Sequence, residues 1–201
     1  MSGLGAAMAG GNGNRPENDF YPTPPEPVVA FLNCEDWKLF PASKGRVWEP
    51  CCGDGAIARV LEGRGFEVVG SDIKPRGYGH VLDFLRAEKA LAPAIVTNPP
   101  YGSDLPEKML RHAMTLGVRY VAFLLKATYW HAASRVALWD QYPPSAILPL
   151  TWRVDFLGKG APTMDVMWVV WRPGLSSPGC FYYPLPKPSP EHVADLFGGT
   201  S

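Results

Sequence analysis

Short apolar runs alternate along the chain with segments in which apolar residues recur at helical spacing. Continuous runs are typical of buried strands, and recurrence at every third or fourth position is typical of amphipathic helices. The runs predict strands at 46–48, 67–72, 81–84, 94–96, 120–126, 146–150 and 165–171. The periodic segments predict helices at 56–63, 105–114 and 129–139, and a first helix that leads towards residue 37. This order indicates an open α/β sheet, in which ligands bind beyond the carboxyl ends of the strands.

The first helix follows a proline-rich segment. Thr23 is a candidate N-cap, and either Pro24 or Pro25 suits the first helical position. Phe20 and Tyr21, which precede it, suit either core packing or one wall of a ligand pocket. Met109 and Met114 belong to the apolar stripe of the helix at 105–114, and we interpret both as core residues.

The stretch Asn98-Pro99-Pro100-Tyr101 follows the strand predicted at 94–96 and therefore lies at the ligand-binding edge of the sheet. Its prolines stiffen the loop and remove two backbone N–H donors, so the loop presents carbonyl oxygens. The side-chain oxygen of Asn98 and the carbonyl of Pro99 can each accept one hydrogen of an amino group, while Tyr101 can stack on a ring. This arrangement suits a flat substrate that carries an amine, although Asn-Pro-Pro also occurs in ordinary turns.

A second motif, at 49–55, joins the first predicted strand to the helix at 56–63 and contains Gly53 and Gly55. A strand, a tight glycine turn and a helix form a nucleotide-binding unit, because glycine lets the backbone approach a ligand closely. The spacing differs from the dinucleotide fingerprint, and position 58 is Ala. Glu49 would repel a phosphate and attract an ammonium or sulfonium group, so a ligand without phosphates is favoured.

Two acids end the next two predicted strands. Asp72 lies 17 residues after Gly55 (72 − 55), where a carboxylate can accept hydrogen bonds from both hydroxyls of a ribose. Asp83 and Phe84 suit the amino group and the ring face of an adenine. The alternative for Asp83 is an N-cap for the turn at 85–88.

Composition limits the class of protein. The 201 residues suit one domain, expected at 16–175 between a flexible tail at 1–15 and a proline-rich tail at 176–201. Lys and Arg together number 19, as do Asp and Glu, so any contact with nucleic acid must come from a local patch. We expect no membrane span and no signal peptide, hence a cytoplasmic protein whose four cysteines are reduced. The histidines are scattered, and no metal site is expected.

Together these motifs resemble the S-adenosylmethionine-dependent DNA methyltransferases that act on amino groups, in particular the adenine-N6 enzymes. The resemblance covers about residues 19–172. The segment 21–24 is similar to the family's cofactor motif ahead of the domain, and 49–55 to its glycine motif in the form that opens with Glu-Pro. Asp72 is similar to the ribose-binding acid, and 98–101 to the catalytic tetrapeptide.

The resemblance implies a Rossmann-like class I fold, with a seven-stranded mixed sheet, helices on both faces and the last strand antiparallel. The hairpin expected from 146–150 and 165–171 agrees with this. The cofactor-binding residues that it implies are Tyr21, Thr23, Pro24, Glu49, Pro50, Cys51, Gly53, Gly55, Asp72, Ile73, Asp83, Phe84 and Asn98. The target would be a flipped adenine of DNA, held by 98–101 and contacted by Lys126, Arg153 and Phe156.

The chain departs from many members of this family, because only 42 residues separate Gly55 from Asn98 (98 − 55 − 1). We therefore expect no separate target-recognition domain. Specificity for a DNA sequence would then be short, provided by loops, shared across an oligomer, or absent, and the candidate loops are 102–106 and 153–163. Compact enzymes of this kind resemble solitary phage methyltransferases. The alternatives are a methyltransferase acting on RNA bases or protein glutamine, and a non-catalytic module that binds the cofactor and nucleic acid.

Overall fold

A computed structural model describes residues 22–34, 45–102, 104–160, 162, 164–174 and 179–194. The expected flexible tail at 1–15 and the cofactor candidate Tyr21 lie outside the described residues. So do residue 37, where the first predicted helix was expected to end, and Thr163 at the end of one predicted loop.

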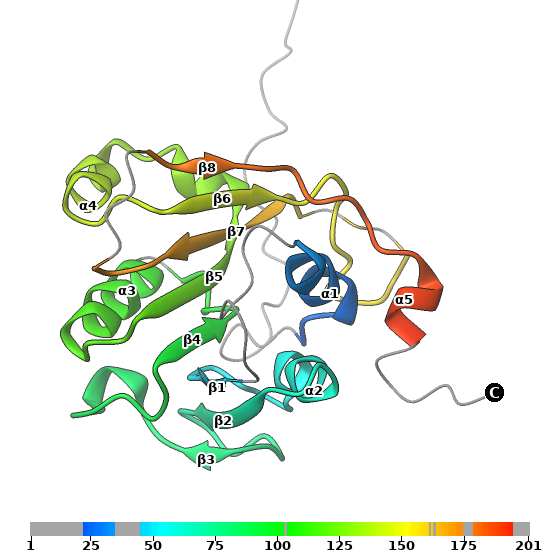
Figure 1. Cartoon of the computed structure of the whole chain (residues 1–201), viewed down its shortest axis with the longest axis horizontal. Helices are drawn as coiled ribbons and strands as arrows, with labels where there is room; N and C mark the ends of the chain where they lie inside the picture. The colour runs from blue at the N-terminus through cyan, green and yellow to red at the C-terminus, as the bar shows by residue number, and fades with distance from the viewer. Residues whose placement is uncertain are drawn as a thin grey trace, which may run out of the picture.

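One sheet of eight strands, with helices on both faces, makes up the centre of the described structure (Figure 1). The strands are β1 (Arg46–Glu49), β2 (Glu67–Asp72), β3 (His80–Val81), β4 (Ala94–Thr97), β5 (Tyr120–Lys126), β6 (Ala146–Pro149), β7 (Val166–Trp171) and β8 (Phe181–Tyr182). Their order in the sheet is β3-β2-β1-β4-β5-β7-β6-β8. Strands β1 to β5 pair in parallel, and β7 runs antiparallel between β5 and β6.

The sheet has eight strands and not the seven expected. The antiparallel strand is present as β7, but β8 follows it and pairs in parallel with the outer edge of β6. β8 comes from the segment expected as a proline-rich tail, and Pro184 and Pro186 lie within four residues of its end. Proline has no N–H to donate to a sheet ladder, so it is tolerated at the end of a short edge strand. The sequence did not predict this strand because the segment around it is rich in proline.

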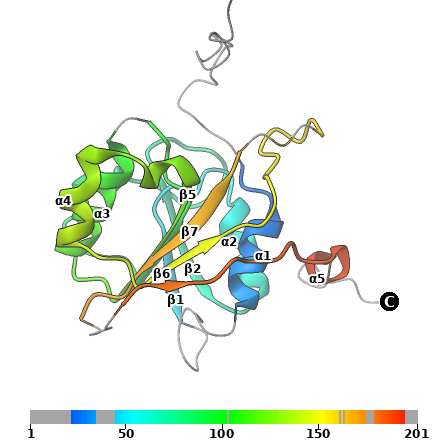
Figure 2. The same ribbon diagram turned by 90° about the horizontal axis from the view of Figure 1, so that it is seen from above.

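The helices lie in two layers. They are α1 (Pro25–Asn33), α2 (Ala56–Gly63), α3 (Leu105–Thr115), α4 (Val136–Gln141) and α5 (Pro190–Ala194), with 3-10 turns η2 (Phe84–Arg86), η3 (Ala127–Trp130) and η4 (Ala133–Arg135). Figures 1 and 2 show α1 and α2 against one face of the sheet and α3 and α4 against the other. The last helix, α5, packs beside α1.

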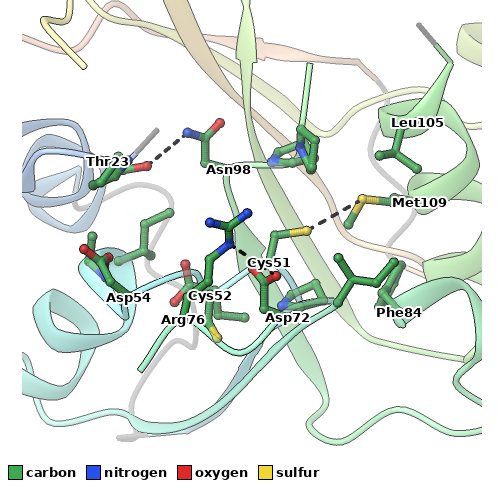
Figure 3. A pocket seen from close by; sticks show the side chains of 18 of the residues that line it. Thr23, Cys51, Cys52, Asp54, Asp72, Arg76, Phe84, Asn98, Leu105 and Met109 are labelled. Carbon is green, nitrogen blue, oxygen red and sulfur yellow. Dashed lines mark hydrogen bonds and ion pairs between the residues drawn. The ribbon is translucent and has the colours of Figure 1, made fainter. Parts of the chain in front are cut away.

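The start of α1 corrects one prediction. Pro25 takes the first helical position as expected, but Pro24 and not Thr23 occupies the N-cap position, and no side chain caps the helix. The hydroxyl of Thr23 is engaged elsewhere, because it accepts a hydrogen bond of 3.0 Å from the side chain of Asn98 after β4 (Figure 3). The tertiary contact takes the place of the local cap.

Two other predicted elements differ from the structure. The strand expected at 81–84 ends at Val81, because Asp83 caps η2 through a hydrogen bond of 3.0 Å from the Leu85 N–H. The helix expected at 129–139 is broken into η3, η4 and α4. A guanidinium N–H of Arg135 donates to the Tyr129 carbonyl at 2.7 Å, the carbonyl that a continuous helix would use for its own hydrogen bond.

β5 shows why its sequence is apolar from Val121 to Leu125. Ala122 and Leu124 belong to the hydrophobic cluster on the α1 side, whereas Val121 and Phe123 belong to the cluster on the α3 side. Successive side chains of a strand point to opposite faces, so a strand covered on both faces has no polar position.

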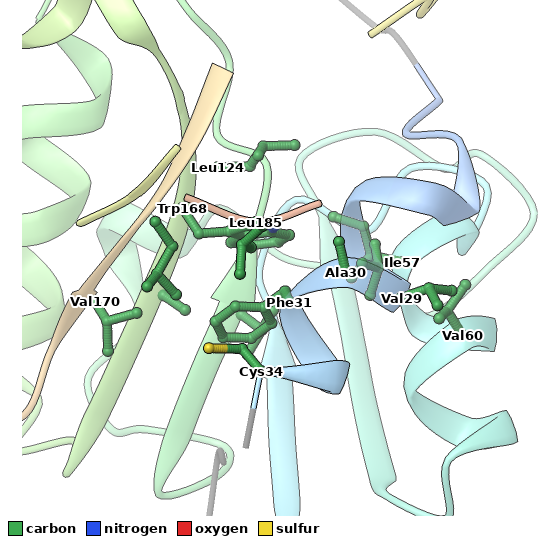
Figure 4. Close-up of a cluster of buried hydrophobic side chains, with 14 of the residues drawn as sticks. Val29, Ala30, Phe31, Cys34, Ile57, Val60, Leu124, Trp168, Val170 and Leu185 are labelled. Carbon is green, nitrogen blue, oxygen red and sulfur yellow. The ribbon is translucent and has the colours of Figure 1, made fainter. Parts of the chain in front are cut away.

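Trp168 in β7 anchors α1 to the sheet. Its indole N–H donates to the carbonyl of Pro27 at 2.9 Å, and its ring stacks on Phe31 with centroids 4.6 Å apart. Figure 4 shows Trp168, Phe31 and Leu185 gathered in one cluster, although they come from three distant parts of the chain. The position of α1, and of Thr23 just ahead of it, therefore depends on β7.

Leu185 completes this cluster from the segment that follows β8. It is 1% exposed. Its N–H donates to the carbonyl of Pro149 at 2.8 Å, and its own carbonyl accepts from the N–H of Thr151 at 3.1 Å. The backbone ladder thus inserts a leucine into the core under α1.

We predict that Leu185→Ala lowers the free energy of unfolding by roughly 2–5 kcal/mol, because it leaves a cavity in a closed core. Urea denaturation followed by circular dichroism measures this. Tyr182→Ala is the matched control, since that side chain is 65% exposed in the same segment. Equal stability of the two variants would show that the segment is not anchored through Leu185.

Candidate functional site

A cavity of about 230 Å3 lies at the carboxyl ends of β1, β2 and β4, where the sequence placed the ligand (Figure 3). Most of the residues predicted for cofactor or amine binding line it. They are Thr23, Glu49, Pro50, Cys51, Asp72, Ile73, Asp83, Phe84, Asn98, Pro99, Pro100 and Tyr101. The fold therefore brings four separate sequence motifs into one cavity.

Three predicted substrate residues do not line the cavity. The ammonium of Lys126 lies 5.0 Å from the ring centroid of Tyr101 in the predicted catalytic loop. Arg153 is exposed and pairs with Asp165 at 3.1 Å. Phe156 packs against the core cluster on the α1 side. A role for Arg153 or Phe156 towards a substrate stays a prediction.

Pro22, Cys52 and Asp54 also line the cavity, and they lie within the predicted motifs at 21–24 and 49–55 without having been assigned a role. The sequence did not point to the remaining wall residues, which are Ala56, Ile57, Arg76, Leu85, Leu105 and Met109. Met109 is 2% exposed, so it is a core residue as expected and a wall residue as well. Arg76 had a signal, because it follows β2 within four residues and the loops after parallel strands meet at this edge.

The glycine turn requires glycine at residue 55 for two reasons. Gly55 has φ +88°, a left-handed conformation that residues with a Cβ rarely adopt, and it precedes α2 directly. A Cβ there would lie 2.6 Å from the ring of Tyr78, which covers the turn from the loop after β2. The Tyr78 hydroxyl donates to Glu62 at 2.7 Å, which fixes the ring in that place.

Asp72 ties the glycine turn to the end of β2. Its Oδ2 accepts from the N–H of Gly53, and its Oδ1 accepts from the N–H of Lys74, each at 3.0 Å. The guanidinium of Arg76 lies 3.8 Å from Oδ1. A carboxylate has about four acceptor positions, so Asp72 retains capacity for hydroxyl donors of a ligand in the cavity.

Glu49 is a buried carboxyl group in the cavity wall. It is 1% exposed, and its Oε2 has no hydrogen-bond partner among the residues that the structure describes. Burial raises its pKa well above the ordinary value of 4.5, and the nearby carboxylates of Asp54 and Asp72 raise it further. A hydrogen bond from the Ala58 backbone offsets this only in part. A cationic ligand group beside Glu49 would stabilise its ionised form.

Phe84 contributes an apolar face to the cavity wall. Phe84 is 4% exposed and packs edge-on against Trp48 and His112, with centroids 5.0 and 5.2 Å apart. Asp83 lines the cavity and also caps η2, so the capping role that the sequence left open is confirmed. A flat apolar ring suits this wall.

Asn98 contributes a buried acceptor to the cavity. Its Nδ2 donates to the Oγ1 of Thr23 at 3.0 Å, while its Oδ1 has no partner within the described part of the chain. A buried acceptor without a partner is costly, so such a group is a candidate ligand contact.

Tyr101 closes the same end of the cavity. Its hydroxyl is buried and, in the described structure, finds no hydrogen-bond partner. Burial raises the pKa of this hydroxyl above its ordinary value, so it stays protonated at neutral pH. Tyr101 thus offers an aromatic ring and a neutral donor.

The described residues contain no group of three or more His, Cys, Asp or Glu side chains that could hold a metal ion. None of the helices described is both long and apolar enough to cross a membrane.

Comparisons with known proteins match the fold and not the sequence. No family model and no curated protein matches this chain. A proposed RNA methyltransferase from Pyrococcus horikoshii is 12% identical, with 82% of this chain and 93% of that chain covered at a TM-score of 0.61. A proposed class I S-adenosylmethionine-dependent methyltransferase from Listeria monocytogenes is 10% identical. The match covers 86% of this chain and 66% of that chain, at a TM-score of 0.57.

A third similar structure is the methyltransferase subunit of a type I restriction-modification system from Streptococcus thermophilus. It is 11% identical, with 86% of this chain and 50% of that chain covered at a TM-score of 0.57. The present chain spans half of that subunit and just under two thirds of the Listeria protein. The fold is therefore that of the class I S-adenosylmethionine-dependent methyltransferases, with a mixed α/β sheet.

The raised pKa of Glu49 predicts how stability depends on pH. Without a ligand, native Glu49 keeps a proton that the unfolded chain releases, so the free energy of unfolding should fall as pH rises above about 4.5 towards the raised pKa. Glu49→Gln removes this contribution and should flatten the curve.

Urea titrations at several pH values measure the effect, with Glu88→Gln as the control because that side chain is exposed. An unchanged pH slope in Glu49→Gln would contradict a protonated Glu49 in the ligand-free protein.

Proposed function

We propose that this protein transfers a methyl group from S-adenosylmethionine to the exocyclic amino group of adenine in DNA. The observation that carries the proposal is the unpartnered, buried Oδ1 of Asn98 in a cavity that also contains Glu49 and Asp72. An amino group is the donor that this acceptor lacks.

The cavity residues fit the cofactor. Glu49 is a buried carboxyl group whose ionised form needs a cation, and S-adenosylmethionine carries an ammonium and a sulfonium. Asp72 has acceptor positions left for ribose hydroxyls, and Phe84 offers an apolar ring to an adenine. When bound, the cofactor supplies a methyl group already activated by its positive sulfur.

The loop at 98–101 would activate an amino nitrogen that is a poor nucleophile. The lone pair of an adenine amino nitrogen is delocalised into the ring, and its hydrogens are donors. Asn98 Oδ1 and the Pro99 carbonyl would accept these two hydrogens, which favours a pyramidal nitrogen and stabilises the positive charge that develops on it. Pro99 and Pro100 keep the loop stiff, so these acceptors are held in place before the substrate binds.

Tyr101 would stack on the target base. The Lys126 ammonium lies 5.0 Å from the Tyr101 ring centroid, near enough to a nucleic acid at this edge to contact its phosphates. A base reaches such a cavity only when it leaves the helix stack.

DNA is favoured by the combined motifs at 21–24, 49–55 and 98–101 and by the structural likeness to a restriction-modification subunit. The formal net charge is zero, so contacts with phosphates would come from local groups such as Lys126, Arg153 and Lys159. RNA is the second candidate, because a proposed RNA methyltransferase has the same fold over 82% of this chain.

Radiolabelled methyl transfer to unmethylated DNA, to RNA and to a protein extract in parallel tests the proposal, with nucleoside analysis of the product. We expect N6-methyladenine in DNA. Asn98→Ala should lower the rate roughly 100- to 1,000-fold, as removal of one electrostatic catalytic group does. Asn33→Ala, an exposed asparagine in α1, is the matched control.

Label in RNA adenine or in protein glutamine would support methyl transfer to an NH2 group and would show that the substrate is RNA or protein instead of DNA. Tight binding of S-adenosylmethionine without transfer to any of the three would contradict the proposed enzyme activity.

A further inference from the structure

We propose that Thr23 is a positioning residue that holds the Asn98 side chain through a hydrogen bond from its NH2 group, in the orientation that leaves the amide oxygen to face the amine. This inference rests on the proposed function. It assigns to Thr23 a different role from the cofactor contact that the sequence motif at 21–24 implies.

The contact itself is direct. The Nδ2 of Asn98 donates to the Oγ1 of Thr23 at 3.0 Å, and the two residues are 75 positions apart in the chain. Thr23 is 5% exposed, so the hydrogen bond is shielded from water. Figure 3 shows the two side chains facing each other across the end of the cavity.

Orientation matters because the two ends of a primary amide have nearly the same shape and opposite hydrogen-bonding character. With Nδ2 bound to Thr23, Oδ1 is left as the acceptor without a partner in the described structure. Rotation of the amide by half a turn would present two N–H donors to an amine that is itself a donor. The Thr23 hydroxyl holds the amide at this place, and because a hydroxyl can also donate, the amine of the substrate, which needs an acceptor, selects the orientation that the structure shows.

The frame around Thr23 is rigid enough for this task. Pro24 follows it directly, and the residue before a proline is restricted to extended conformations. Behind it, α1 is fixed to β7 by the hydrogen bond from Trp168 to the Pro27 carbonyl and by stacking on Phe31. On the other side, Pro99 restrains the loop that follows Asn98. The donor and the acceptor are thus each held by a stiff segment.

Two variants of Thr23 separate the hydroxyl from the shape of the side chain. Thr23→Val keeps the shape and removes the acceptor, whereas Thr23→Ser keeps the hydroxyl. We expect Thr23→Val to lower kcat roughly 10- to 100-fold, the loss associated with one buried hydrogen bond, while Thr23→Ser stays close to the wild type. The dissociation constant for S-adenosylmethionine, measured by titration calorimetry, should be unchanged in both variants.

A double-mutant cycle shows whether Thr23 acts through Asn98. In an Asn98→Ala background the further change Thr23→Val should have no effect on kcat, because the group that it positions is absent. Full additivity of the two changes would overturn the proposal. A raised cofactor dissociation constant with unchanged kcat in Thr23→Val would overturn it too and would make Thr23 a cofactor ligand.

An NMR measurement tests the hydrogen bond without any activity. The side-chain NH2 signals of Asn98, assigned by their loss in Asn98→Ala, should exchange slowly with solvent in the wild type and in Thr23→Ser. They should exchange faster in Thr23→Val. Equal exchange in all three proteins would overturn the proposal.

The two readouts keep the proposals distinct. Slow exchange that depends on Thr23, in a protein that methylates no substrate, would refute the proposed function and leave the hydrogen bond between Thr23 and Asn98 supported. Normal methylation by Thr23→Val would refute the positioning role alone.

Discussion

The hydrogen bond from Trp168 to the carbonyl of Pro27 joins a strand and a helix that the chain order keeps far apart. It joins β7 to α1 across 141 residues, and the stack of Trp168 on Phe31 supports it in the same place. Both groups are buried, so the hydrogen bond is made in a medium of low polarity where losing it is expensive. The cavity depends on this contact, because the residues just before α1 form one of its walls.

Regular elements were predictable wherever one local pattern decided the structure. The bounds of α2 and β2 agree with the predicted 56–63 and 67–72, since a glycine turn, a helical stripe and a run of apolar residues each point the same way. The segment 129–139 was predicted wrongly as one helix, because the Arg135 guanidinium takes the Tyr129 carbonyl that a continuous helix would use, and the apolar spacing does not reveal this contact. β8 was missed because the proline content of its surroundings is typical of loose segments.

For the candidate site, the position of the residues was predictable from the sequence, and the state of each group was not. Asp72, Phe84 and Asn98 were placed at one edge by the rule that parallel strands end together, and the structure puts all three in one cavity. The state of each group could not be predicted, because it depends on neighbours from elsewhere in the chain. That Glu49 is almost fully buried, and that the oxygen of Asn98 is the end of the amide left without a partner in the described structure, follow from tertiary packing alone.

The position of Leu185 also bears on how the protein is made. The cluster beneath α1 includes Val28 and Leu185, which are 157 residues apart (185 − 28). A chain emerging from the ribosome therefore cannot close this core until residue 185 is free of the exit tunnel. Until then the apolar face of α1 lacks its contact with Leu185, and contacts of such long sequence separation form slowly. Completion of the wall that contains Thr23 is thus a late step in synthesis, during which a chaperone that holds apolar segments would find a binding surface.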